Sequence, residues 1–312
     1  MRIKSKHSYL HIIFLFLLFT TIFILYGCGA EKKSFEISTV KGTRDSSPVC
    51  LVPESTGEIC FSADTYLIDI SNAKQGYLMA RYTGSCEKVK FQITIPDGTT
   101  YTYNLTDQLE AFPLSSASGT YTVGIFENVQ GKQYSTLMSE SFDIVLENEF
   151  GAYLYPNQYV QFTEENETIA LGEKLAYSAN TDLDVVSNVY NYLICNVTYD
   201  DSKAESVQSG YLPSIDETIQ TNTGICLDYA AVMASILRSQ QIPTHLEVGY
   251  AGTVYHAWIS TYIKDVGWVN GIIQFDGTDW ELMDPTFGAS TGSKELKKFI
   301  GDGENYMVKY IY

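Results

Sequence analysis

The sequence predicts an α+β fold in which an N-terminal β-sandwich is followed by a mixed α+β domain. Between about residues 50 and 148, apolar and polar side chains alternate with a period of two, and no convincing long helix interrupts them. Beyond residue 150 the pattern changes to helical spacing followed by further strands. A chain of 312 residues has room for about two domains, so we place the boundary between residues 149 and 150.

The composition is that of a folded chain with an acidic surface. Apolar residues make up 45% of the sequence, which is enough to bury a core, and the net charge is -17. A protein that binds nucleic acid needs a basic surplus to neutralise phosphates, so this charge argues against a nucleic-acid partner.

The first residues are typical of a secretory signal. Basic side chains at positions 2, 4 and 6 precede an apolar stretch over 12–26, and Leu25-Tyr26-Gly27-Cys28 resembles a bacterial lipobox. An uncleaved anchor is the alternative, but the apolar stretch is short for a membrane span of about 20 residues. We therefore expect residues 1–27 to be a lipoprotein signal peptide. Cys28 would be lipidated and hold the protein on the extracellular face of the bacterial cell membrane, and residues 28–48 would be a flexible tether.

Residues 49–149 predict an immunoglobulin-like β-sandwich. The clearest hairpin joins 91–95 to 101–105 through the turn residues Pro96-Asp97-Gly98, and the same alternation recurs at 121–125 and 142–146. No residues in this half have a catalytic spacing. A spacer and a binding module are both open as its role.

The six cysteines are expected to have different roles, which depend on where they lie in the chain. Cys28 is expected to carry the lipid and Cys226 the chemistry, which leaves four others in a compartment that permits disulfides. Cys50 and Cys60 could close a small loop, with Cys86 as a competitor. Cys195 lies among apolar residues and is expected to be a buried free thiol. None of these four has a pattern that suggests metal.

Cys226 is predicted to begin a helix in the C-terminal half. An earlier helix is expected over 183–195, with Asp182 and Asp184 as cap candidates, and a polar loop from 200 to about 221. Small and apolar residues then follow Cys226 at helical spacing and stop before Pro243. A helix start stabilises an anion, so a thiolate there is a well-populated nucleophile. The alternative is a buried cysteine that packs as a small apolar residue.

Three strands are expected after this helix. They lie at 244–250, at 255–259, which holds His256, and at 280–284, which ends at Asp284 before a proline. A cysteine on a helix start, a histidine on a strand and an aspartate on a neighbouring strand follow the order of a Cys-His-Asp triad. In such a triad the histidine takes the thiol proton and the aspartate fixes the histidine tautomer.

Four segments carry a resemblance to a known family. They are "GICLDYA" at 224–230, "ILRSQQIPTHLEVGY" at 236–250, "YHAWI" at 255–259 and "LMDPTF" at 282–287. With these segments, residues of about 155–312 resemble the transglutaminase-like superfamily, whose core is shared with papain-type proteases. The resemblance implies a transglutaminase-like (papain-like) domain over 150–312, in which Cys226 is the nucleophile, His256 the general base and acid, and Asp284 the orienting carboxylate. His245 stands where such proteins often carry arginine, and we expect it to be a strand residue.

The resemblance implies acyl transfer on protein or peptide amides through a thioester. Water as acceptor would give hydrolysis, as in a protease or amidase, and an amine would give a transglutaminase crosslink. The backbone N–H of Cys226 is one oxyanion donor, and Tyr199 is a candidate for a second. No cofactor or metal is expected, since the chain after the signal keeps only His245 and His256 and no paired ligand spacing. The alternative function is a catalytically inactive binding or adhesion protein of the cell surface.

Overall fold

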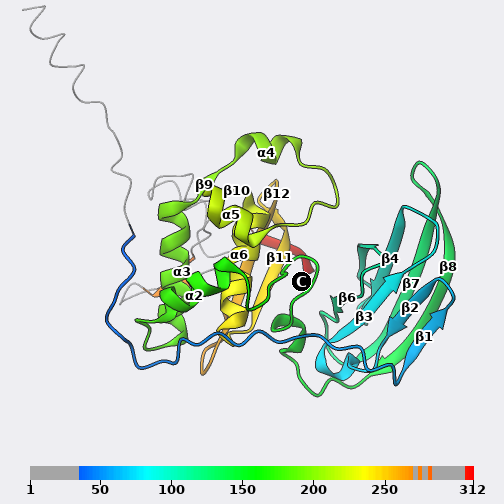
Figure 1. Cartoon of the computed structure of the whole chain (residues 1–312), viewed down its shortest axis with the longest axis horizontal. Coiled ribbons are helices and arrows are strands. Elements are labelled where there is room, and N and C mark those ends of the chain that lie inside the picture. The colour runs from blue at the N-terminus through cyan, green and yellow to red at the C-terminus, as the bar shows by residue number, and fades with distance from the viewer. Residues whose placement is uncertain (1–34, 270–272, 276–279, 283–305) are drawn as a thin grey trace, which may run out of the picture. The chain divides into compact units, whose positions relative to one another are not determined.

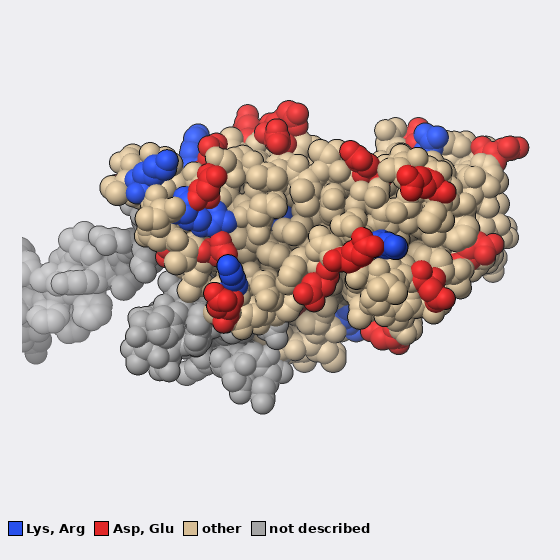
Figure 2. Space-filling view, turned by 90° about the horizontal axis from the view of Figure 1, so that it is seen from below, with Lys and Arg blue, Asp and Glu red and all other residues tan. Residues whose placement is uncertain are grey.

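The fold is described from a computed structural model, which covers residues 35–269, 273–275, 280–282 and 306–312 (Figure 1). Residues 1–27 and Cys28 lie outside the described residues, so the signal and lipidation stay predictions. Of the part of the chain that is described, no helix is long and apolar enough to cross a membrane. On the face shown in Figure 2, acidic side chains lie in several separate groups with fewer basic ones between them, in line with the net charge of -17.

The N-terminal half consists of two antiparallel sheets. One sheet has the order β1(Cys60–Ala63), β2(Tyr66–Asp69), β3(Tyr77–Tyr82) and β6(Glu110–Pro113). The other has the order β5(Thr100–Leu105), β4(Val89–Thr94), β7(Gly119–Gln130) and β8(Gln133–Ile144). Short 3-10 turns occur at Ala73–Gln75 and Gly151–Tyr153.

Alternating side chains of the two sheets meet in a shared core. Phe91 on β4 lies opposite Tyr103 on β5, and both rings pack edge-on against Phe112 on β6, at centroid distances of 4.9 and 5.0 Å. All three are at most 1% exposed. The prediction of a strand-rich N-terminal half is therefore confirmed, and its immunoglobulin-like type stays a prediction.

The C-terminal half combines helices with a four-stranded antiparallel sheet. The sheet has the order β13(Gly267–Val269), β12(Val254–Ile263), β11(Thr244–Ala251) and β16(Tyr306–Ile311). The helices are α2(Glu167–Ala176), α3(Asp182–Asn196), α4(Asp201–Ser206), α5(Ile215–Thr221) and α6(Cys226–Ser239). Two small sheets pair β9(Thr198–Tyr199) with β10(Thr223–Gly224) and β14(Ile273–Phe275) with β15(Trp280–Leu282). The α+β fold class is confirmed.

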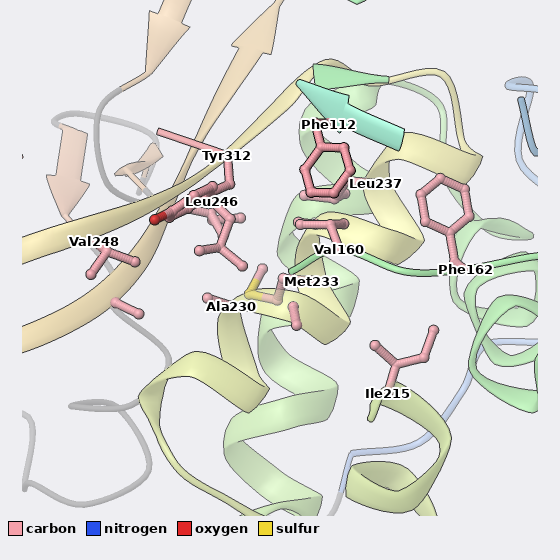
Figure 3. Packing of buried hydrophobic residues seen from close by; sticks show 14 of the residues in the cluster. Phe112, Val160, Phe162, Ile215, Ala230, Met233, Leu237, Leu246, Val248 and Tyr312 are labelled. Carbon is pink, nitrogen blue, oxygen red and sulfur yellow. The ribbon is translucent and has the colours of Figure 1, made fainter. Parts of the chain in front are cut away.

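Helix α6 is the centre of this half. Every residue from Asp228 to Ser239 is buried, because α2, α3 and α5 pack on it together with strands β11 and β12 (Figure 3). Gly172 lets α2 lie close to α6, since a Cβ there would lie 2.7 Å from a side-chain carbon of Ile236. At the other end of α6, the fully buried Arg238 donates hydrogen bonds to the carbonyl oxygens of Thr244, Tyr155 and Tyr312.

The segment between β9 and β10 differs from its predicted form. In place of a polar loop up to about residue 221, it contains the short helices α4 and α5. Asp200 and Ser214 cap them by accepting hydrogen bonds from the backbone N–H groups of Lys203 and Glu217. Helices of six and seven residues show too few turns for a helical period to stand out from the sequence. At α3, similarly, Thr181 is the N-cap and Asp184 closes a capping box with it.

The described part of the predicted flexible tether is held on the C-terminal half. The backbone N–H groups of Gly42, Arg44 and Val49 donate to the carbonyl oxygens of Tyr177, Ala179 and Ser239. Gly42 fits closely, because a Cβ there would lie 2.0 Å from the Ala179 oxygen. We call residues 42–49 the N-terminal strap. The backbone groups of these residues find partners on another part of the chain, and the flexible tether over 28–48 stays a prediction.

The five described cysteines are free thiols. The loop that Cys50 and Cys60 could close is therefore open, and Cys86 pairs with neither. Cys195, predicted to be buried, is free but only partly buried at the end of α3.

Candidate active site

The first residue of α6 is Cys226, as the sequence predicts. Strand β10 pairs in parallel with β9, and Ile225 then adopts an extended backbone that ends the strand and starts the helix. Gly224 leaves room for this turn, since a Cβ there would lie 2.8 Å from the Cβ of Asp228. Cys226 is partly buried and packs against the core.

Asp228 holds the start of α6 in place. Its fully buried carboxylate accepts a hydrogen bond from the Ile225 N–H at 2.8 Å, an ion-paired hydrogen bond from Lys203 Nζ at 2.8 Å, and one from the Tyr211 hydroxyl at 2.6 Å. Lys203 Nζ also lies 4.6 Å from the centre of the Tyr211 ring. We call these three side chains the Asp228 clasp. It ties α4 and the loop after it to the helix start, two residues from Cys226.

The contacts of the clasp shift the pKa values of Tyr211 and Lys203. Burial, followed by the hydrogen bond to Asp228, raises the pKa of Tyr211 to about 12. Burial alone would lower the pKa of Lys203, but its bonds to Asp228 and Tyr211 raise it overall. The sequence analysis missed this group, because Lys203 and Tyr211 lie in the predicted polar loop. The one available signal was Asp228 at the third helical position, which favours bonding back to the residue before the helix.

His256 is the third residue of β12. It is 4% exposed, pairs with Gly249 on β11, and its ring is 6.2 Å from the Trp258 ring, nearly parallel to it. Gly249 is needed there because a Cβ would lie 2.0 Å from the Met307 oxygen of β16. The predicted strand position of His256 is thus confirmed.

The structure brings the elements that carry Cys226 and His256 together. Helix α6 packs directly on β12, the strand that carries His256. Side chains alternate along β12, so His256 lies on the same face of the sheet as Trp258. Ala257 and Ile259 lie on the opposite face, in the core that α6 shares. The pairing of Cys226 with His256 stays a prediction.

Asp284 lies outside the described residues. The strand predicted before it is present as β15, which pairs with β14. The role of Asp284 as orienting carboxylate stays a prediction.

Tyr199, the candidate oxyanion donor, lies close to the helix start. It is the second residue of β9, where its backbone pairs with Gly224, two residues before Cys226. The side chain is partly buried and packs against the core. This position keeps Tyr199 as the candidate side-chain donor.

His245 is a buried strand residue, as expected. It stacks on Trp268 at a centroid distance of 3.6 Å, meets the Tyr153 ring edge-on at 4.0 Å, and its Nδ1 lies 3.2 Å from Glu247 Oε1. Burial lowers the pKa of His245, although Glu247 acts in the opposite sense. Among the described residues, no three His, Cys, Asp or Glu side chains gather as a metal site would require.

Comparison with known proteins supports the reading of this region. The family model of the transglutaminase-like superfamily matches residues 169–271, which include Cys226 and His256. UPF0252 protein MJ1282 of Methanocaldococcus jannaschii is 25% identical over 174 residues, and the match covers 50% of this chain and 49% of that protein. The chain thus spans about half the length of this relative.

Solved structures show more distant likenesses. A candidate cysteine protease from Cytophaga hutchinsonii is 16% identical with a TM-score of 0.33, covering 73% of this chain and 68% of its own. Red sea bream transglutaminase is 12% identical with a TM-score of 0.29, covering 67% of this chain and 48% of its own. Since these TM-scores are low, the family rests on the sequence match. That match covers about a third of the chain and includes the segments around Cys226 and His256.

Proposed function

We propose that the protein is a cysteine-dependent enzyme that transfers acyl groups from protein or peptide amides through a thioester. One observation carries the proposal. Inside a transglutaminase-like domain, a cysteine is the first residue of a buried helix, and that helix packs on the strand that holds His256. A cysteine in this position, with a histidine on the strand that the helix packs on, makes Cys226 the proposed nucleophile.

In the proposed reaction His256 takes the thiol proton and the sulfur of Cys226 attacks the carbonyl carbon of the amide. The C–N bond then breaks, and His256 returns its proton to the departing amine, which leaves a thioester on Cys226. Asp284 would hold the imidazole in the tautomer that can accept the proton. A second nucleophile then attacks the thioester and releases the thiol.

The oxyanion of each tetrahedral intermediate needs fixed donors. The backbone N–H of Cys226 has no intrahelical partner, so it is the natural first donor. Tyr199, whose backbone pairs with Gly224 beside the helix start, is proposed as the side-chain donor. Its hydroxyl would point at charge that develops only during the reaction.

The second nucleophile decides the outcome of the reaction. Water would give hydrolysis, so that the protein would act as a peptidase or amidase. An amine would give an isopeptide crosslink. The Cys28 lipid would keep either activity on the extracellular face of the cell membrane. Expressed in a bacterium, the wild type should label with a palmitate analogue, and Cys28→Ala should lose the label; equal labelling of both would rule out the anchor.

The proposal is tested by treating surface proteins and peptides with the purified protein and with Cys226→Ser. Mass spectrometry should find new termini, deamidated glutamines or isopeptide bonds only with the wild type. New termini would indicate hydrolysis, and isopeptide bonds would indicate crosslinking. If neither protein changes any substrate, and Cys226 alkylates no faster than the partly buried Cys195, the protein is an inactive binding or adhesion protein.

A further inference from the structure

Helix α6 covers only part of one face of the four-stranded sheet. Two cross-strand pairs, Leu246 with Ile259 and Val248 with Ala257, point to this face and are at most 9% exposed. Figure 3 shows Leu246 and Val248 beside Ala230 and Met233 of α6. The helix begins at Cys226, one turn before Ala230. The sheet continues beyond that point, and the helix does not.

Exposure changes sharply at the next cross-strand pair on the same face. Tyr250 pairs with Tyr255, and Met307 on β16 pairs with Tyr250 from the other side, so the three side chains form one row. Tyr255 is 56% exposed and Met307 58% exposed, against 3% for Ala257 one pair earlier. We call Tyr250, Tyr255 and Met307 the apolar ledge.

The ledge has a defined shape. The rings of Tyr250 and Tyr255 meet edge-on at a centroid distance of 5.5 Å, an arrangement that aromatic pairs prefer. Lys309 Nζ lies 5.1 Å from the centre of the Tyr250 ring, so a cation–π contact also holds that ring. The exposed ring of Tyr255 therefore packs against the Tyr250 ring, which in turn contacts Lys309.

The ledge lies next to the proposed nucleophile. The pair Tyr250 and Tyr255 follows the pair Val248 and Ala257 on the same face, Val248 lies beside Ala230, and α6 begins at Cys226 one turn before Ala230. A peptide whose carbonyl carbon lies at Cys226 would therefore pass its neighbouring side chain over the ledge.

We propose that the apolar ledge is a specificity subsite that takes an apolar, preferably aromatic, side chain next to the amide that Cys226 attacks. This rests on the proposed function, since it makes the substrate a peptide with such a residue. An aromatic side chain seated there would bury its own surface together with the exposed parts of Tyr255 and Met307. It could also extend the edge-on stacking of the tyrosine pair.

The test uses peptidyl vinyl sulfones that differ only in the residue next to the electrophile, which is Phe, Leu or Gly. Rates of Cys226 labelling in the full chain are read by mass spectrometry, and each is divided by the rate with iodoacetamide, which needs no subsite. For the wild type, the Phe reagent should exceed the Gly reagent on the order of tenfold, with Leu between. Tyr255→Ser and Met307→Ser should each bring the ratio toward one.

A matched control is Tyr134→Ser, which removes an exposed tyrosine of β8 in the N-terminal half and should keep the wild-type ratio. The subsite is overturned if the wild type shows no preference for Phe over Gly, or if both ledge variants keep it. It is also overturned if iodoacetamide reacts but no peptidyl reagent does. A Phe preference in a protein that turns over no amide would instead refute the proposed function and leave the subsite standing.

Discussion

Arg44 in the N-terminal strap donates a hydrogen bond from Nε to Asp182 at the start of α3, at 2.7 Å. The rest of its guanidinium group donates to the side chain and the backbone oxygen of Gln240, directly after α6. One side chain from the N-terminal segment therefore joins the start of one C-terminal helix to the end of another. The strap is part of the C-terminal fold although it precedes the sandwich in sequence.

Arg44→Ala should lower the free energy of unfolding by about 1–2 kcal/mol, because charge-assisted hydrogen bonds to two partners are lost. Urea unfolding measures the change, and Lys41→Ala, at an exposed neighbouring position, is the control. A fragment of residues 150–312, which the sequence analysis treats as a domain, should melt at a lower temperature than residues 35–312. Equal melting temperatures would show that the strap contributes nothing to this fold.

Asp228→Asn should destabilise the start of α6 by about 1–3 kcal/mol, since the half-buried Lys203 loses its ion-pair partner. Tyr211→Phe removes one hydrogen bond and should cost about 1 kcal/mol. Chemical denaturation gives both values. The matched control is Asp201→Asn, which changes an exposed aspartate on α4 in the same way. If the two Asp→Asn variants are equally stable, the clasp does not stabilise the helix.

Asp216 should make the stability of the C-terminal half depend on acid. Burial would raise its pKa, but hydrogen bonds from Asn166 and from the backbone N–H groups of Thr168 and Glu167 lower it overall. A carboxylate with a lowered folded-state pKa stabilises the fold above its ordinary value of 3.8, and this contribution is lost as the pH falls through the lowered pKa. The protonated group no longer accepts the bonds that hold the start of α2.

The measurement is the free energy of unfolding from about pH 5 down to about pH 2. Asp216→Asn should flatten part of the decline that the wild type shows. Glu217→Gln, at the next and exposed position of α5, should keep the wild-type slope. An unchanged slope in Asp216→Asn would contradict the role of Asp216.

Local patterns were enough to predict much of this fold. The start of α6 at Cys226 and the strands that hold His245 and His256 follow from helical spacing, alternation and Pro243. The start of α6 depends on Gly224 and the extended Ile225, which are its two preceding residues. Such signals lie in neighbouring residues, so one sequence contains them.

The contacts that depend on distant residues were not predictable in this way. The strap is polar and without period, and its partners Asp182 and Gln240 lie far along the chain. The clasp and the apolar ledge likewise depend on which elements become neighbours. Tyr255 and Ala257 lie on the same face of β12. Tyr255 is exposed and Ala257 is buried because α6 covers the sheet at Ala257 and ends before Tyr255.

The proposed triad gives the sharpest prediction of function. At pH 7 the iodoacetamide reaction of Cys226 should be slower in His256→Ala than in the wild type, because the partner that accepts the thiol proton is lost. His245→Ala is the matched control, since it removes a buried histidine that stacks on Trp268, and it should keep the wild-type rate if folded. Equal rates in all three would leave Cys226 as a packing residue.

Asp284→Asn should fold like the wild type and lose most turnover. The amide cannot hold the imidazole in the required tautomer, and in the analogous serine triad this loss is on the order of 10⁴ in rate. Iodoacetamide labelling of Cys226 should fall far less than turnover does, because His256 is still present to accept the proton. Circular dichroism melting confirms folding, and turnover is read on the peptide substrates found with the wild type. If Asp284→Asn keeps wild-type turnover, the carboxylate that orients His256 must be sought elsewhere in the chain.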